Sequence, residues 1–278
     1  MAPFGVTTVN VNGVRAAARK GGIAWLGQRL RSGDVSVVCM QEVRATTDQF
    51  LEVLRDEGLD DLHWAHDDST RLGHSGVALL STVPMTNVKT GLGPKEFAGT
   101  GRWVQGTVQT PAGPLTVASV YVFAGDLDKP VQEDKYKFLD AMSKWFTAAT
   151  KKSAAGEGHF IAAGDFNVAH TEFDIKNATG NVKSAGFYPL ERDRLTYWFD
   201  RIGVVDLGRQ HAGPGVHGPY TWWSMRGKAF DTDTGWRIDY HVATPELAAT
   251  KPRMVVERAP SWGERWSDHA PLTAHFDL

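Results

Sequence analysis

The chain has 278 residues, 42% hydrophobic and 22% charged, a balance typical of a folded globular protein whose core needs no disulfides. The formal net charge of −2 argues mildly against a nucleic-acid-binding protein, although basic residues can still gather on one face. A single cysteine, no run of 18 apolar residues and no signal-peptide pattern favour a cytoplasmic protein without a membrane segment.

The first third of the chain alternates apolar strands with helices. Strands are predicted at 6–12, 35–40 and 75–81, and helices at 14–32 and after a cap at Thr46 or Thr47. Asn10 and Asn12 share one face of the first strand, because side chains two residues apart point the same way. Glu42 follows the second strand directly, so polar side chains gather where strands end.

The middle of the chain repeats this pattern. A hairpin is predicted from strands at 103–109 and 115–122, a buried strand at 160–163, and helices at 130–151 and 186–202. Tyr121 lies near the end of the hairpin. Asp165 and Asn167 follow the buried strand and should project to the same side. Taken alone, these two residues fit an ordinary turn as well as a ligand site.

The last part contains predicted strands at 220–224, 236–243 and 272–276. Asp239 is expected inside an apolar strand, where a charged group is costly unless it is paired. Its partner could be catalytic, or simply Arg237 or a backbone group. Many strands, often joined by hairpins and interspersed with helices, predict an α/β (α+β) protein. Its two sheets would be packed between helices in one domain over residues 1–278.

Polar residues at so many strand ends predict one shared site. They are Asn10, Asn12, Glu42, Tyr121, Asp165, Asn167, Asp239, Asp268 and His269. Glu42 and Asp268, with Asn12, offer hard oxygen ligands for a single Mg²⁺. His269 and Asp239 match a base and the carboxylate that orients it. Asp165, or a metal-bound hydroxide, could activate water. This combination indicates metal-assisted phosphodiester hydrolysis.

Five short blocks carry a family resemblance. Residues 8–15, 40–43, 164–170, 236–239 and 267–271 resemble the signature blocks of the exonuclease III family, in order and over nearly the whole chain. This family comprises Mg²⁺-dependent apurinic/apyrimidinic (AP) endonucleases within the endonuclease/exonuclease/phosphatase superfamily. Residues 174–177, 180–181 and 185–192 resemble its DNA-repair branch.

The resemblance implies a four-layer α/β sandwich with two mainly antiparallel sheets. It also implies a base-excision-repair enzyme that cleaves the DNA backbone 5′ to abasic sites and trims 3′ ends. The cofactor would be Mg²⁺, with Mn²⁺ as a substitute. The partner would be double-stranded DNA with abasic sites or blocked 3′ ends. The protein would be a monomer that acts on this DNA at the bacterial nucleoid.

The family pattern also assigns roles to residues of this sequence. The metal ligands would be Glu42, Asn12 and Asp268, with Asn10, Asp165, Asn167 and His269 as further candidates. The catalytic residues would be Tyr121, Asp165, Asn167, Asp239 and His269. The DNA backbone would be contacted by Arg15, Lys20, His74, Arg102, Asn177 and Asn181. An extruded abasic sugar would meet Trp222, Trp236 and Ile238.

Some positions depart from the family pattern. Phe123 and Ala124 stand where Pro-Asn or Pro-Gln is usual, Ser184 replaces an asparagine, and Trp222 stands where a smaller aromatic is common. Two alternatives stay open. One is another phosphoesterase of the superfamily, acting on RNA, inositol phosphates or a sphingolipid. The other is a catalytically inactive DNA-binding module, which should have lost ligands that this sequence keeps.

Overall fold

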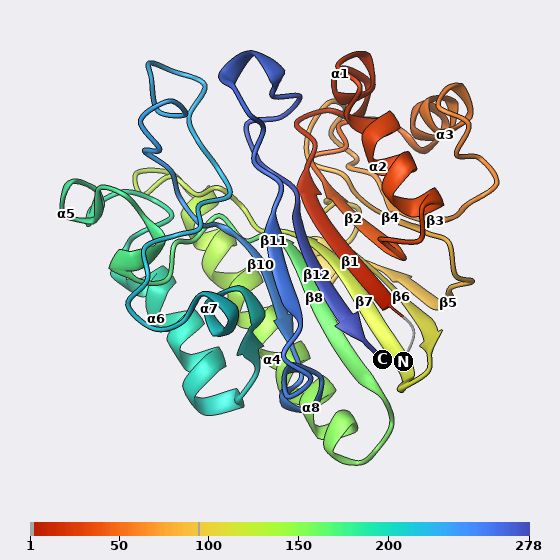
Figure 1. Ribbon diagram of the computed structural model, residues 1–278. Coiled ribbons are helices and arrows are strands. Elements are labelled where there is room, and N and C mark those ends of the chain that lie inside the picture. The colour runs from red at the N-terminus through yellow and green to blue at the C-terminus, as the bar shows by residue number, and fades with distance from the viewer. Residues whose placement is uncertain (1–2, 94) are drawn as a thin grey trace.

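The structure is a computed structural model that describes residues 3–93 and 95–278 (Figure 1). The strands are β1 (Pro3–Asn10), β2 (Val37–Gln41), β3 (His63–Asp67), β4 (Val77–Ser81), β5 (Thr86–Thr90), β6 (Trp103–Thr110), β7 (Gly113–Tyr121), β8 (His159–Asp165), β9 (Val205–Asp206), β10 (Asp239–Ala243), β11 (Arg253–Val256) and β12 (Leu272–Asp277). The α-helices are α1 (Val14–Arg19), α2 (Gly22–Arg31), α3 (Thr47–Asp56), α4 (Val131–Ala154), α5 (Ala178–Asn181), α6 (Pro189–Tyr197), α7 (Leu207–Ala212) and α8 (Pro245–Ala248). Shorter turns are η1 (Lys95–Phe97), η2 (Glu172–Asp174), η3 (Trp198–Ile202) and η4 (Trp262–Glu264).

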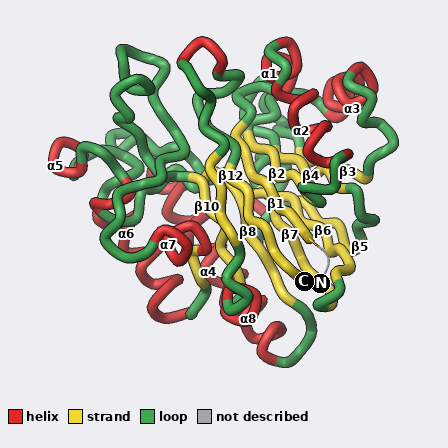
Figure 2. The backbone as a smooth tube through the Cα atoms, viewed as in Figure 1, coloured by secondary structure: helices red, strands yellow, loops and turns green. Residues whose placement is uncertain are grey.

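The strands form two six-stranded sheets with helices outside them (Figure 2). Sheet one has the order β11-β12-β1-β2-β4-β3, and sheet two has the order β5-β6-β7-β8-β10-β9. Only the β1–β2 and β7–β8 pairs are parallel among the pairings of these named strands. The prediction of two mainly antiparallel sheets between helices is confirmed.

Three apolar layers hold the sandwich together. Alternating side chains of both sheets, such as Val37 and Val117, meet in the central layer. The other face of sheet one packs on α1 to α3, for example through Leu26 and Phe50. The other face of sheet two packs on α4 and α6. Burying apolar surface on both faces of both sheets makes four layers of structure. The single domain over residues 1–278 stays a prediction.

Two predicted elements in the N-terminal part differ from the structure. The helix expected at 14–32 is two helices, because Gly21 has a left-handed φ of 79° that interrupts the helical conformation between α1 and α2. The first strand ends at Asn10, since Asn12 also has a positive φ, of 48°. Thr46 caps α3 as expected, accepting a hydrogen bond from the backbone of Gln49.

Three later predictions also need correction. The helix expected at 186–202 begins only at Pro189, a residue suited to the first helical turn, and its last turn is the π-helical η3. No regular strand covers 220–224, where Trp222 makes only isolated bridges. The strand expected at 236–243 begins at Asp239, so this carboxylate lies at the strand's start and not in its interior.

Among residues 3–93 and 95–278, no helix combines the length and the apolar character needed to cross a membrane.

Candidate active site

The ends of several strands meet at one edge of the sandwich. β7 and β8 run parallel with Tyr121 beside Asp165, and β10 runs antiparallel to β8 with Asp239 opposite Asp165. On the other sheet, β1 ends at Asn10. The register within one sheet therefore brings Tyr121, Asp165 and Asp239 together, and Asn10 joins them from the other sheet through a 2.9 Å hydrogen bond to Asp165.

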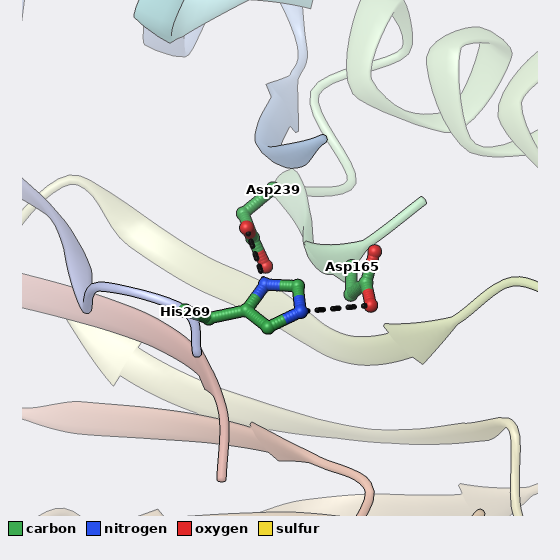
Figure 3. Close-up of side chains that lie close together, drawn as sticks. All are labelled: Asp165, Asp239 and His269. Carbon is green, nitrogen blue, oxygen red and sulfur yellow. Dashed lines mark hydrogen bonds and ion pairs between the residues drawn. The ribbon is translucent and has the colours of Figure 1, made fainter. Parts of the chain in front are cut away.

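His269 lies between two buried carboxylates (Figure 3). Its Nδ1 is 2.9 Å from Oδ2 of Asp239, and its Nε2 is 3.7 Å from Oδ2 of Asp165. Thr221 Oγ1 accepts a hydrogen bond from the backbone N–H of Asp239, at 3.2 Å. Arg237 instead pairs with two other carboxylates, so Asp239 is free to orient the imidazole.

A second set of contacts connects the two sheets. The side-chain amide of Asn10 donates to Glu42 and to Asp165, each at 2.9 Å. The hydroxyl of Tyr121 donates to the same Glu42 oxygen at 2.7 Å. The other oxygen of Glu42 pairs with Arg44. Asn10 thus links a candidate metal ligand on sheet one with a candidate base on sheet two.

Donors also fix Asp165 and Asp268. The backbone N–H of Asn167 donates to Oδ1 of Asp165 at 2.9 Å, while its side-chain amide donates to the carbonyl of Val122 at 2.9 Å. The side-chain amide of Asn12 donates to Oδ1 of Asp268 at 2.9 Å, and the indole of Trp222 donates to Oδ2 at 3.0 Å. These contacts place the carboxylates before any ligand arrives.

Burial and neighbouring charges change the acidity of the site. Burial raises the pKa of Asp165 to about 7, against the opposing charge of His269. Burial alone would lower the pKa of His269, but Asp239 and Asp165 raise it to about 10. For Asp268, burial acts to raise the pKa, but the His269 charge and the Trp222 hydrogen bond hold it below its usual range. Burial and the nearby carboxylate of Glu42 raise the pKa of Tyr121 well above its usual value, so this phenol stays a neutral donor.

Three residues of the site have a strained backbone conformation. Asn12, Glu42 and Asn167 have left-handed φ values of 48°, 50° and 51°. Such conformations are uncommon for residues other than glycine and cost free energy that the surrounding structure must offset. Each directs a polar side chain at the point where the chain leaves a strand.

An open cavity of about 370 Å³ lies over these groups. Its polar lining includes Glu42, Asp165 and Asp268. Its apolar lining includes Trp222 and Trp236, whose rings meet edge to face with centroids 6.1 Å apart. The rest of the lining is Tyr121, Ala124, Gly125, Asn167, Ser184, Ala185, Gly186, Ile238 and His269.

The donor set suits a hard divalent cation. Carboxylate oxygens of Glu42, Asp165 and Asp268 line one cavity, and oxygen ligands of this kind are those that Mg²⁺ prefers. Asp165, Asp239 and His269 also have ligand atoms within 4.8 Å of one another. Because His269 Nδ1 is already hydrogen-bonded to Asp239, this second group is better described as an imidazole held between carboxylates.

The candidate contacts to the DNA backbone are not among the residues that line this cavity. Arg15 and Lys20 are exposed on and after α1, and Arg15 shares a smaller cavity of about 190 Å³ with His74. Asn177 and Asn181 lie at the two ends of α5. The helices α1 and α5 flank this end of the sandwich on opposite sides (Figure 1).

Arg102 occupies a different environment from the one expected of a free DNA contact. Its guanidinium lies 3.6 Å from the ring centroid of Phe123 and 4.9 Å from that of Tyr121. It also donates to the carbonyl of Tyr121 at 3.3 Å. Phe123, which departs from the family pattern, packs on Phe97 and Phe138. Phe123 thus holds the guanidinium of Arg102 against its ring.

Sequence reasoning missed a buried ion pair beneath the cavity. Lys135 on α4 and Glu191 on α6 are fully buried, 2.7 Å apart. The ammonium also donates to the carbonyl oxygens of Ala124 and Asn167, and Glu191 accepts from the backbone of Gly186. One ion pair thus joins three loops that line the cavity.

Two further residues of the site, Arg44 and Ser267, were also missed. Arg44 follows Glu42 by two residues, and Ser267 begins the Ser-Asp-His block. Ser267 donates to the carbonyl of Asn10 at 2.6 Å and accepts from the backbone of His269 at 3.2 Å. Ser267 lies inside the block 267–271 and Arg44 directly follows the block 40–43, so their positions in the sequence could have indicated a role in the site.

Comparison with known proteins agrees with this geometry. Residues 7–269 match the family described as the Endonuclease/Exonuclease/phosphatase family. An exodeoxyribonuclease of Bacillus subtilis (strain 168) is 31% identical over 265 residues, which cover 95% of each chain. The solved structure of an AP endonuclease from Archaeoglobus fulgidus is 25% identical, with a TM-score of 0.83 and complete coverage of both chains. A 3′ phosphatase from Neisseria, solved with a product DNA hairpin, is 26% identical with a TM-score of 0.79, and 99% of each chain is covered.

The chain belongs to the Endonuclease/Exonuclease/phosphatase family, whose members are metal-dependent. Within that family it is a hydrolase of the nuclease branch, and the prediction of a DNA-repair phosphodiesterase is confirmed.

Proposed function

We propose that the protein is a Mg²⁺-dependent enzyme of base excision repair that cleaves DNA 5′ to abasic sites and trims 3′ ends. The observation that carries this proposal is the composition of one cavity. Carboxylates of the candidate site and His269 line it together with the two indoles of Trp222 and Trp236. An apolar surface suited to a sugar without a base thus lies beside the reactive groups.

Glu42, Asp268 and Asn12 would hold the Mg²⁺, with Asn10 beside them. Glu42 is the ligand least replaceable by its neighbours, because Asn10 and Tyr121 already direct its carboxylate. When bound, the ion would supply positive charge that stabilises the developing negative charge on the phosphate.

Asp165 would accept the proton of the attacking water. A carboxyl whose pKa is near 7 takes a proton effectively at neutral pH, and Asn167 and Asn10 hold both its oxygens in place. His269, kept protonated by Asp239, would offer positive charge and a hydrogen bond to the scissile phosphate. Asn167 and Tyr121 would contact the same phosphate.

Substrate choice would follow from the apolar wall. Extruding a nucleotide from a duplex costs a few kcal/mol, and least where pairing is already lost. Trp222, Trp236 and Ile238 would receive the bare sugar and exclude a nucleotide that keeps its base. Arg15, Lys20, His74, Arg102, Asn177 and Asn181 would support the DNA backbone on either side.

The proposal also includes double-stranded DNA with abasic sites or blocked 3′ ends as the partner, a monomeric protein, and action at the bacterial nucleoid in the cytoplasm. Mn²⁺ should substitute for Mg²⁺, because both ions accept octahedral oxygen ligands.

The test is a gel assay on two labelled duplexes, one with a single abasic site and one with a recessed 3′ end. We expect a nick 5′ to the abasic site and stepwise shortening of the 3′ end in Mg²⁺, with both lost in EDTA. Cleavage of RNA or of inositol phosphates in place of both duplexes would contradict the proposal.

A further inference from the structure

The carboxylate of Asp268 is held by different donors on its two oxygens. Asn12 Nδ2 donates to Oδ1 at 2.9 Å, and the indole Nε1 of Trp222 donates to Oδ2 at 3.0 Å. Ser267 Oγ approaches Oδ1 at a longer 3.5 Å. Each carboxylate oxygen has two acceptor sites, so a site on Oδ2 stays available after the indole has bound.

The backbone holds the indole of Trp222 in a defined position. Trp222 and Trp236 exchange two backbone hydrogen bonds, each of 2.9 Å, in an isolated bridge. The next residue, Trp223, donates its backbone N–H to the carbonyl of Asp268 at 3.1 Å. The segment carrying Trp222 is thus tied to Asp268 through both the main chain and the side chain.

The indole of Trp222 therefore makes two kinds of contact. Its ring lines the cavity beside Trp236, while its N–H donates to the carboxylate of Asp268. A phenylalanine could form the wall equally well, but it has no N–H to donate. The indole consequently does something that pocket lining alone does not require.

We propose that Trp222 is a positioning residue for Asp268, which it fixes in the orientation that binds the divalent cation. The inference rests on the proposed function, in which Asp268 is a metal ligand. Hydrogen bonds to the ligands of a metal site orient them, and losing one such partner typically weakens metal affinity by about 10- to 100-fold. Trp222 would thus serve the cation as well as the substrate.

The competing explanation is that Trp222 only packs and that its hydrogen bond is incidental. Packing alone predicts that a smaller aromatic changes the melting temperature or the fit of DNA, while the affinity for the cation stays the same. A measurement of cation binding without DNA separates the two explanations, because the substrate pocket is then empty.

The experiment titrates Mn²⁺ into the free protein and measures unbound Mn²⁺ by electron paramagnetic resonance. Native protein is compared with Trp222→Phe, which keeps an aromatic wall but removes the donor. Trp236→Phe is the matched control, because it shortens the neighbouring ring of the same wall and leaves the Trp222–Asp268 hydrogen bond in place. Melting curves in EDTA confirm that each variant is folded.

We expect Trp222→Phe to bind Mn²⁺ about 10- to 100-fold more weakly than native protein, and Trp236→Phe to bind it as native protein does. Equal affinities in native protein and Trp222→Phe would overturn the inference. So would a Trp222→Phe protein that is unfolded in EDTA, because Trp222 would then serve the fold. Native protein that binds no Mn²⁺ would instead contradict the proposed metal site itself.

Discussion

Asp165 and Asp239 lie directly opposite each other on β8 and β10, yet only Asp239 hydrogen-bonds to His269 Nδ1. The two carboxylates share a register position and differ in their donors. Asp165 also accepts hydrogen bonds from Asn10 and Asn167. The two carboxylates therefore have different roles. Asp239 orients the imidazole of His269, whereas Asp165 is held by Asn10 and Asn167.

This relationship predicts strongly non-additive losses. Asp239→Asn and His269→Gln should each lower kcat on an abasic duplex by about a hundredfold or more, and the double variant should lose little beyond either single one. The reason is that Asp239 acts through His269. Steady-state kinetics on the three variants tests this, and losses that multiply in the double variant would show independent roles.

Acid should destabilise the protein through His241. This residue is buried between the sheets, with Nε2 3.0 Å from the carbonyl oxygen of Val6. Burial lowers its pKa from 6.5 to about 4, although the Val6 carbonyl opposes the shift. In the unfolded chain His241 therefore binds a proton near pH 6.5, whereas in the folded chain it binds one only near pH 4. The stabilisation is complete above pH 6.5 and is lost as the pH falls towards 4.

Urea unfolding at pH 7 and pH 5 measures this effect. His241 should contribute a loss of about 2 kcal/mol over that interval. His241→Phe should remove most of that contribution, whereas the exposed His211→Gln should keep it. An equal loss in His241→Phe and native protein would assign the acid sensitivity to other groups.

Lys135→Met should destabilise the protein by about 3–5 kcal/mol, because it leaves the buried charge of Glu191 without its partner. The double variant Lys135→Met/Glu191→Gln should recover part of that loss by removing the unpaired charge. Thermal unfolding of the single and double variants checks this. A double variant no more stable than Lys135→Met would show that the pair is not the origin of the effect.

Trp236→Ala should reduce the preference for abasic over intact duplex while the protein stays folded. The apolar wall then no longer excludes a nucleotide that carries its base. The quantity to measure is the ratio of kcat/KM on the two duplexes, beside a melting curve. Trp64→Ala, a half-exposed tryptophan on the edge strand β3, is the control. An unchanged ratio, or an unfolded variant, would show that Trp236 serves the packing of the core and not the choice of substrate.

Much of the site could be predicted because its residues lie next to apolar strands. Asp165 ends β8 and Asn167 follows it shortly, while Asp268 and His269 shortly precede β12, so local patterns mark them. The strand ends meet in space through the pairing of strands within each sheet and the packing of the two sheets. The family resemblance implied the sandwich and the roles of these residues, but not this pairing.

Other features depend on contacts that no local pattern contains. Lys135 looks like an ordinary lysine on an amphipathic helix, and only the packing of α4 against the loops reveals its buried partner. Residues 220–224 have strand-like composition, but their backbone groups pair singly with Trp236 and Asp268, so no regular strand forms. Gly21 breaks a helix whose apolar spacing continues across it.

The most direct test of the whole account is the turnover of Glu42→Ala on an abasic duplex at saturating Mg²⁺. Glu42 is central to the proposed metal site, so kcat should fall by about a hundredfold or more while the melting curve shows a folded protein. Glu52→Ala, which removes an exposed carboxylate from α3, should cleave as native protein does. Turnover by folded Glu42→Ala equal to that of native protein would contradict the assignment of the metal site.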